Sequence, residues 1–107
     1  MLFRSELPIS AHAVLTRALE VQPASVVLTE GGPRLMAEFF AGRCLDELFL
    51  TLAPQVVGRS PGDDRPGFVT GRHFLPDDPR WGKLVSLRQG GSHLFLRYAF
   101  EAGHTAA

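Results

Sequence analysis

Residues 26–35 read Val26-Val27-Leu28-Thr29-Glu30-Gly31-Gly32-Pro33-Arg34-Leu35. The apolar run that opens this stretch does not alternate, as is typical of a parallel strand covered on both faces. The two glycines can take a positive φ and let another molecule approach the backbone closely. The proline fits the first position of a helix, where its missing N–H costs nothing. The stretch therefore predicts a strand over residues 26–28, a tight turn and a helix that begins at Pro33.

The helix predicted over residues 33–42 has one apolar face and one polar face. Gly42 lies where a C-terminal cap is expected. The apolar residues recur at the spacing of a helix that faces a core in water; they are Leu35, Met36, Phe39 and Phe40. The start of the helix therefore points away from the packed face and is free for another use.

The start of this helix suits an anion. The N–H groups of Gly32, Arg34 and Leu35 have no partner within a helix, and together with the helix dipole they favour negative charge, most often a phosphate. The guanidinium of Arg34 adds a charge-assisted hydrogen bond. Glu30 follows the predicted strand, at the place where open α/β sheets bind ligands. A purely structural turn also explains these residues, because two adjacent glycines are a weak phosphate signal.

The remaining chain predicts a helix, a second buried strand and a hairpin. Ser10 is a suitable N-cap for a helix that runs through Val21. Residues 48–57 are apolar on both faces, with Pro54 indicating a bulge or an edge near their end, so that residues 26–57 form a right-handed βαβ unit. Residues 84–89 and 93–100 flank a Gly90-Gly91-Ser92 turn and predict a β-hairpin. Between them, residues 58–83 are rich in Gly, Pro and Asp and predict surface loops.

Side chains that are expected to be buried follow from these patterns. The stripe of the first helix is Val14, Leu15, Ala18 and Leu19, and one face of the last strand is Leu94, Leu96, Tyr98 and Phe100. The loop residues expected to pin the loops to the body are Phe68, Val69, Phe74 and Trp81. The core is expected to contain Leu15, Leu19, Val27, Phe39, Leu50, Leu96 and Tyr98.

Composition excludes several classes of function. The 107 residues carry zero formal net charge and no basic run, which argues against a nucleic-acid partner. No apolar run is long enough to span a bilayer, and we expect a cytoplasmic protein without a membrane partner. The single cysteine, Cys44, allows no internal disulfide, and the four histidines show no metal-ligand spacing, so no metal site is expected. Arg97 is expected to be a residue of the sheet surface.

Three motifs follow one another along the chain. They are Val26-Val27-Leu28-Thr29-Glu30-Gly31-Gly32-Pro33-Arg34-Leu35-Met36, then Cys44-Leu45-Asp46-Glu47-Leu48-Phe49-Leu50-Thr51-Leu52-Ala53-Pro54-Gln55-Val56-Val57-Gly58, and then Leu96-Arg97-Tyr98. Their order resembles the reductase domain of bacterial riboflavin biosynthesis, which has a dihydrofolate-reductase-like fold. The resemblance covers about residues 10–100 and the C-terminal half of that domain. We therefore expect an α/β protein with a partial dihydrofolate-reductase-like fold over residues 1–107: a mixed sheet with a βαβ unit, a C-terminal β-hairpin and flanking helices.

The resemblance also implies an activity and a site. The reaction is hydride transfer from NADPH to the open-chain ribose carbon of a phosphoribosylaminopyrimidine, with Glu30 at the substrate and no catalytic side chain, because the cofactor carries the hydride. The residues implied to contact NADPH are Gly31, Gly32, Pro33, Arg34, Leu35, Met36, Ala37 and Glu38. Arg34 departs from the family, which most often has a small or hydroxyl residue at this position.

Two other functions remain open. A truncated enzyme of this kind acts as a non-catalytic dimerisation or interaction module, and a related reductase acts on another pterin or pyrimidine, since fold and cofactor do not fix the substrate. In each case a homodimer is expected, because a strand buried on both faces needs hydrogen-bonded neighbours at both edges.

Overall fold

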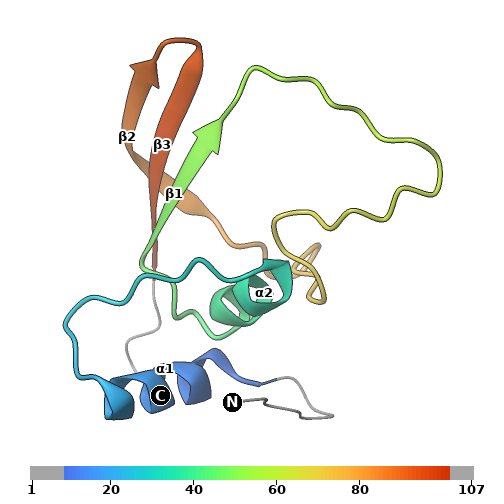
Figure 1. Ribbon diagram of the computed structural model, residues 1–107. Helices are drawn as coiled ribbons and strands as arrows, with labels where there is room; N and C mark the ends of the chain where they lie inside the picture. Colours follow the sequence, from blue (N-terminus) through green and yellow to red (C-terminus); the bar gives the residue numbers. More distant parts are fainter. Residues whose placement is uncertain (1–8, 102–107) are drawn as a thin grey trace. The chain divides into compact units, whose positions relative to one another are not determined.

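The computed structural model describes residues 9–101 of the chain. Its elements in chain order are α1 (Ala11–Val21), α2 (Pro33–Ala41), β1 (Glu47–Leu52), β2 (Gly82–Gly90) and β3 (His93–Phe100) (Figure 1). The expected α/β class is confirmed, and the helices followed by a C-terminal hairpin agree with a partial dihydrofolate-reductase-like fold. No helix within residues 9–101 is long and apolar enough to cross a membrane.

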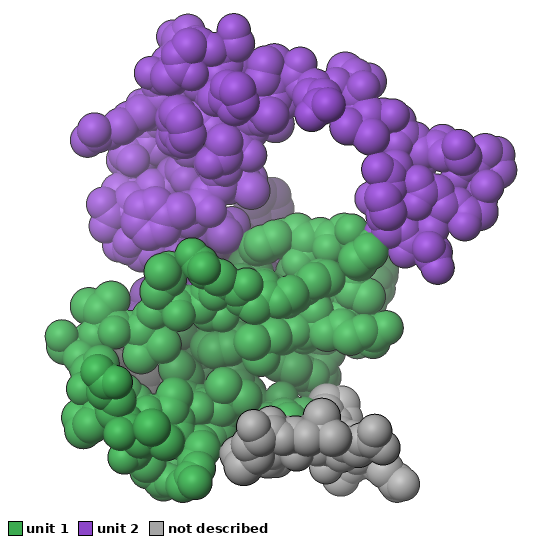
Figure 2. Space-filling view, in the orientation of Figure 1, with its two compact units in different colours: residues 1–44, 66–73, 103–107 green, residues 45–65, 74–102 purple. Residues whose placement is uncertain are grey.

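The described chain forms two compact units, coloured separately in Figure 2. One unit contains α1, α2 and residues 66–73, and the other contains the three strands. Each unit is discontinuous in sequence, because residues 66–73 return to the helical unit from the middle of the second half.

Helix α1 begins and ends where its sequence signals predict. The Ser10 side chain accepts a hydrogen bond from the Ala13 N–H at 3.1 Å, which confirms the N-cap. α1 packs on α2, and Ala11 is buried while Val14 and Leu15 are half-buried. The C-terminal half of the predicted stripe is less well covered, with Leu19 37% exposed.

Helix α2 supplies most of the core of the helical unit. Pro33 is its first residue and Gly42 its C-cap, both as predicted. Beyond the cap, the Arg43 N–H donates to Phe40 O and the Cys44 N–H to Phe39 O, the hydrogen-bond pattern of a Schellman motif. The predicted apolar face is confirmed: Met36, Ala37, Phe39 and Phe40 are buried and Leu35 is half-buried.

The sheet has the strand order β1-β3-β2, and both pairings are antiparallel. β2 and β3 form the predicted hairpin, with a two-residue turn at Gly91 and Ser92. Gly91 has φ +59, and Ser92 is not among the residues with positive φ, as in a type II′ turn. The register shifts between Leu84 and Ser86, so that Val85 is an extra residue in β2.

This bulge decides which side chains share a face of the sheet. Leu84 pairs with Tyr98 and Leu87 with Leu96, so two leucines that are three residues apart lie on the same face. The face also carries the even-numbered leucines of β1, which pair with Tyr98, Leu96 and Leu94. We call this set the apolar sheet face: Leu48, Leu50, Leu52, Leu84, Leu87, Leu94, Leu96, Tyr98 and Phe100.

Two of the predicted strand segments differ in the structure. Residues 26–28 are not in a strand, and Val26 and Leu28 are 82% and 77% exposed. No strand within residues 9–101 pairs with them, and an extended segment without a partner gains no ladder hydrogen bonds. The predicted strand over residues 48–57 ends at Leu52, shortly before Pro54, which cannot donate to a ladder. It lies at the edge of the described sheet and pairs with β3 in the antiparallel direction.

The predicted core is therefore only partly formed. Of its seven residues Phe39 is buried, whereas Val27 and Leu50 are 47% and 41% exposed. Leu15, Leu96 and Tyr98 are half-buried. The reason is that residues 26–28 join no sheet and that Leu50 and Leu52 of the apolar sheet face stay exposed. Trp81, expected to pin a loop, is 84% exposed, so that expectation is wrong.

Candidate functional site

Helix α2 begins at Pro33, as the sequence predicts. Gly32 is the N-cap with extended backbone (φ −73°, ψ −179°), and its carbonyl accepts a hydrogen bond from the Met36 N–H at 3.0 Å. Among the described residues no side chain caps this helix end. The N–H groups of Arg34 and Leu35 therefore have no acceptor within residues 9–101, and together with the helix dipole they favour an anion.

Gly31 and Gly32 differ in the space around them. Neither has positive φ, so their left-handed freedom is not used here. A Cβ on Gly31 would overlap Cδ2 of Leu35, whereas a Cβ on Gly32 would meet nothing within 4 Å. The Gly31 N–H donates to Oγ1 of Thr29 at 3.3 Å, which fixes the turn. A side chain at Gly31 would therefore displace the end of Leu35, whereas Gly32 faces open space at the helix start.

Two charged side chains near the helix start, those of Arg34 and Glu30, do not pair with each other. Arg34 has no ion pair or hydrogen bond from its guanidinium within the described part of the chain. Glu30 is exposed and likewise has no ion pair among residues 9–101. A cation in the first turn of a helix is unfavourable unless an anion offsets it. The helix start is consequently left with one uncompensated guanidinium.

Residues 66–73, which we call the strap, lie across α2. The Thr70 N–H donates to Pro33 O at 3.1 Å, and the ring of Phe68 meets that of Phe40 edge-on, with centroids 5.8 Å apart. The contact of Phe68 confirms its predicted role. The strap thereby borders the start of α2 within the same unit.

The carboxylate of Glu38 fastens the other end of the strap. It accepts hydrogen bonds from Nε of Arg72 at 3.3 Å and from Nη2 at 3.0 Å. Sequence reasoning gave no role to Arg72 or Thr70. Arg72 lies 34 residues from its partner, and no periodic pattern connects positions so far apart.

The residues predicted to contact a cofactor do not all lie at the exposed start of α2. The structure places Gly31, Gly32, Pro33 and Arg34 together at the helix start. Met36 and Ala37 are buried, so their side chains face the core. Glu38 is paired with Arg72, and Leu35 is half-buried against Gly31. Only the first turn presents groups that a ligand can reach from solvent.

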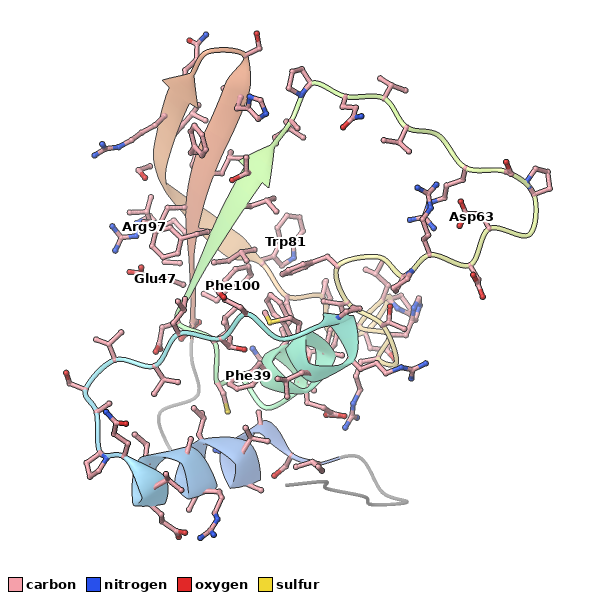
Figure 3. The ribbon with its side chains drawn as sticks, viewed as in Figure 1. Phe39, Glu47, Asp63, Trp81, Arg97 and Phe100 are labelled. Atoms are coloured by element: carbon pink, nitrogen blue, oxygen red, sulfur yellow. The ribbon has the colours of Figure 1, made fainter. Side chains whose placement is uncertain are left out.

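A second charged cluster lies on the sheet, where Glu47 and Arg97 point towards each other (Figure 3). Nε and Nη2 of Arg97 donate to the two carboxylate oxygens of Glu47 at 2.9 and 2.6 Å, and the guanidinium lies over the ring of Phe49, 5.5 Å from its centroid. These hydrogen bonds hold the pKa of Glu47 below its ordinary value of 4.5. The same pair raises the pKa of Arg97. Arg97 is a residue of the sheet surface, as predicted.

Cys44 and His12 meet where α1 approaches the end of α2. The Cys44 Sγ lies 3.5 Å from Nε2 of His12, and it donates to the carbonyl of Gly42 at 3.4 Å. The thiol is half-buried and free of disulfides. Within residues 9–101 no three His, Cys, Asp or Glu side chains are grouped to hold a metal ion.

The sequence matches a known protein family over most of its length. The model of the family described as "RibD C-terminal domain" matches residues 9–94, about four fifths of the chain. The chain belongs to the RibD C-terminal domain family. The match includes α1, the helix start with its glycines, and the strap. A comparison with curated proteins gave no match. Membership of the RibD C-terminal domain family assigns the chain to the riboflavin-biosynthesis type of reductase domain.

Proposed function

We propose that this chain binds NADPH at the start of α2 and serves hydride transfer to the ribose carbon of a phosphoribosylaminopyrimidine. The observation that carries the proposal is the helix start without a side-chain cap, beside an arginine that has no ion pair within residues 9–101. It offers N–H donors, an open position at Gly32 and the guanidinium of Arg34. Membership of the family supports the reaction class.

The residues present fit the phosphate groups of such a cofactor. A dinucleotide phosphate would accept hydrogen bonds from the N–H groups of Arg34 and Leu35, and the guanidinium of Arg34 would add a charge-assisted bond. When bound, NADPH supplies the hydride. The task of the chain is then to hold and orient the reactants, with the exposed carboxylate of Glu30 positioned to bind a polar group of the substrate.

Calorimetric titration of NADPH into the wild-type chain and two Gly32 variants tests the proposal. Gly32→Asp and Gly32→Ala both fit the open space at this position, and both leave the buried face of α2 unchanged. Only the aspartate places a negative charge where the phosphate binds. We expect Gly32→Asp to weaken NADPH binding at least about tenfold, because its carboxylate repels the phosphate and accepts the N–H groups that the phosphate would use. Gly32→Ala, which adds neither charge nor acceptor, should retain affinity within a few-fold.

Equal binding by the two variants would show that the nucleotide does not sit at Gly32. A wild-type chain that binds no NADPH would contradict the proposed function altogether.

The exposed apolar sheet face favours a second proposal, an interaction module whose partner is another copy of the chain. Leu52, Leu84 and Leu87 are 56%, 49% and 55% exposed and lie on one face. Contiguous apolar surface of this kind is typical of protein interfaces. β1 is also an edge strand whose outer backbone groups have no strand partner within residues 9–101. The two proposals are compatible, because the helix start and the apolar sheet face belong to different units.

A further inference from the structure

Two arginines lie near the carboxylate of Glu38: Arg72 of the strap, which binds it, and Arg34 on the same helix. Glu38 follows Arg34 by four residues on α2, the spacing at which an arginine and a glutamate pair along a helix. In the structure, both carboxylate oxygens of Glu38 are engaged by Arg72 instead. The two-bond geometry favours the pair with Arg72, and the Glu38 side chain is only 15% exposed in this pair. Arg34 is left without an ion pair among the described residues.

The strap passes close to this same guanidinium at Gly71. A Cβ on Gly71 would lie 4.0 Å from Nη1 of Arg34. Gly71 has φ +97, a backbone conformation that side-chain-bearing residues rarely adopt. Its neighbours on either side, Thr70 and Arg72, are the two residues bonded to α2. The strap therefore runs past Arg34 between two fixed points.

We propose that Arg72 is a positioning residue for the anion site. By engaging Glu38, Arg72 keeps the carboxylate from neutralising Arg34, so that the guanidinium stays available to a phosphate group at the start of α2. Glu38 has the matching role of anchoring the strap. This inference rests on the proposed function, because it specifies how the same site is kept competent for its anion.

Titration of inorganic pyrophosphate and of NADPH into a set of variants tests the inference. In Arg72→Gln, Glu38 is released to pair with Arg34, and we expect both affinities to fall about threefold to tenfold. Adding Glu38→Gln to this variant removes the competing carboxylate, and affinity should return to within about twofold of wild type. Arg88→Gln, which removes an exposed arginine of β2, is the control for loss of one positive charge and should bind as wild type does.

Combining Arg72→Gln with Arg34→Gln tests whether Arg72 affects anion binding through Arg34 or by contacting the anion itself. If Arg72 acts through Arg34, Arg72→Gln should have no further effect on affinity in an Arg34→Gln chain. Amide exchange at Thr70, whose N–H bonds to Pro33 O, reports whether the strap stays in place in each variant.

Two results would overturn the inference while the proposed function stands: unchanged affinity in Arg72→Gln, or an equal loss on the Arg34→Gln background. A wild-type chain that binds neither pyrophosphate nor NADPH would overturn both together.

Discussion

At the scale of the residue, the Glu47–Arg97 pair makes stability depend on pH. Arg97 lowers the pKa of Glu47 in the folded chain by hydrogen bonding, and the unfolded carboxyl returns to its ordinary value of 4.5. A group with a depressed folded pKa stabilises the fold above its unfolded pKa and loses that contribution as pH falls through its folded pKa. The pair is partly exposed, so salt also screens it.

We therefore expect the free energy of unfolding to decline as pH falls below about 4.5, with a smaller decline in Glu47→Gln. Urea titrations at a series of pH values measure both slopes. Asp64→Asn, on a loop and without an ion pair in the described chain, is the control and should keep the wild-type slope. An identical pH dependence in Glu47→Gln and wild type would contradict this assignment.

At the scale of the element, the end of α2 contains a residue with an unfavourable backbone conformation. Arg43 follows the C-cap with φ 52, where helices most often have glycine. An L-residue in this conformation costs about 1 kcal/mol relative to glycine. Arg43→Gly should accordingly be more stable than Arg43→Ala by about 1 kcal/mol, as chemical denaturation would measure.

The comparison of these two variants isolates the backbone, because both remove the arginine side chain and whatever it contacts. Equal stability of the two would mean that the helix end relaxes out of the left-handed conformation.

The ends of the helices could be predicted from sequence because their signals are local. Ser10, Pro33 and Gly42 mark caps through hydrogen bonds and backbone preferences within one turn. The strand expected at residues 26–28 depends instead on a neighbour elsewhere in the chain, and no local pattern reports whether that neighbour exists. The same holds for the bulge at Val85, which is defined only by pairing with β3.

The candidate site shows the same division. The helix start and its donors follow from the Gly-Gly-Pro sequence, and so does Arg34. The strap does not, because Thr70 and Arg72 reach α2 through contacts that span more than thirty residues of chain. The family resemblance implies a cofactor contact for Glu38; in the structure its carboxylate is engaged by Arg72, and the cofactor contact stays a prediction.

At the scale of the whole molecule, the apolar sheet face predicts self-association. Light scattering should give a mass near twice the 11.7 kDa of one chain. Leu50→Lys puts a charge on the apolar sheet face and should yield monomers, whereas Thr51→Lys, one residue along on the opposite face, should leave the dimer intact. Both variants alter the same edge strand, so they differ only in the face. A well-folded wild-type monomer would contradict the prediction.

The discontinuous composition of the helical unit has a consequence for the order in which the chain folds during synthesis. Its first part ends at Cys44, but the strap, which also belongs to it, ends at His73. At ribosomal rates of about 5–20 residues per second, the strap emerges roughly two to six seconds after α2. During that interval Phe68 and Arg72, the partners of Phe40 and Glu38, have not yet been translated. During these seconds the apolar face of α2 lacks the contact with the strap and is open to chaperones that bind apolar segments of nascent chains.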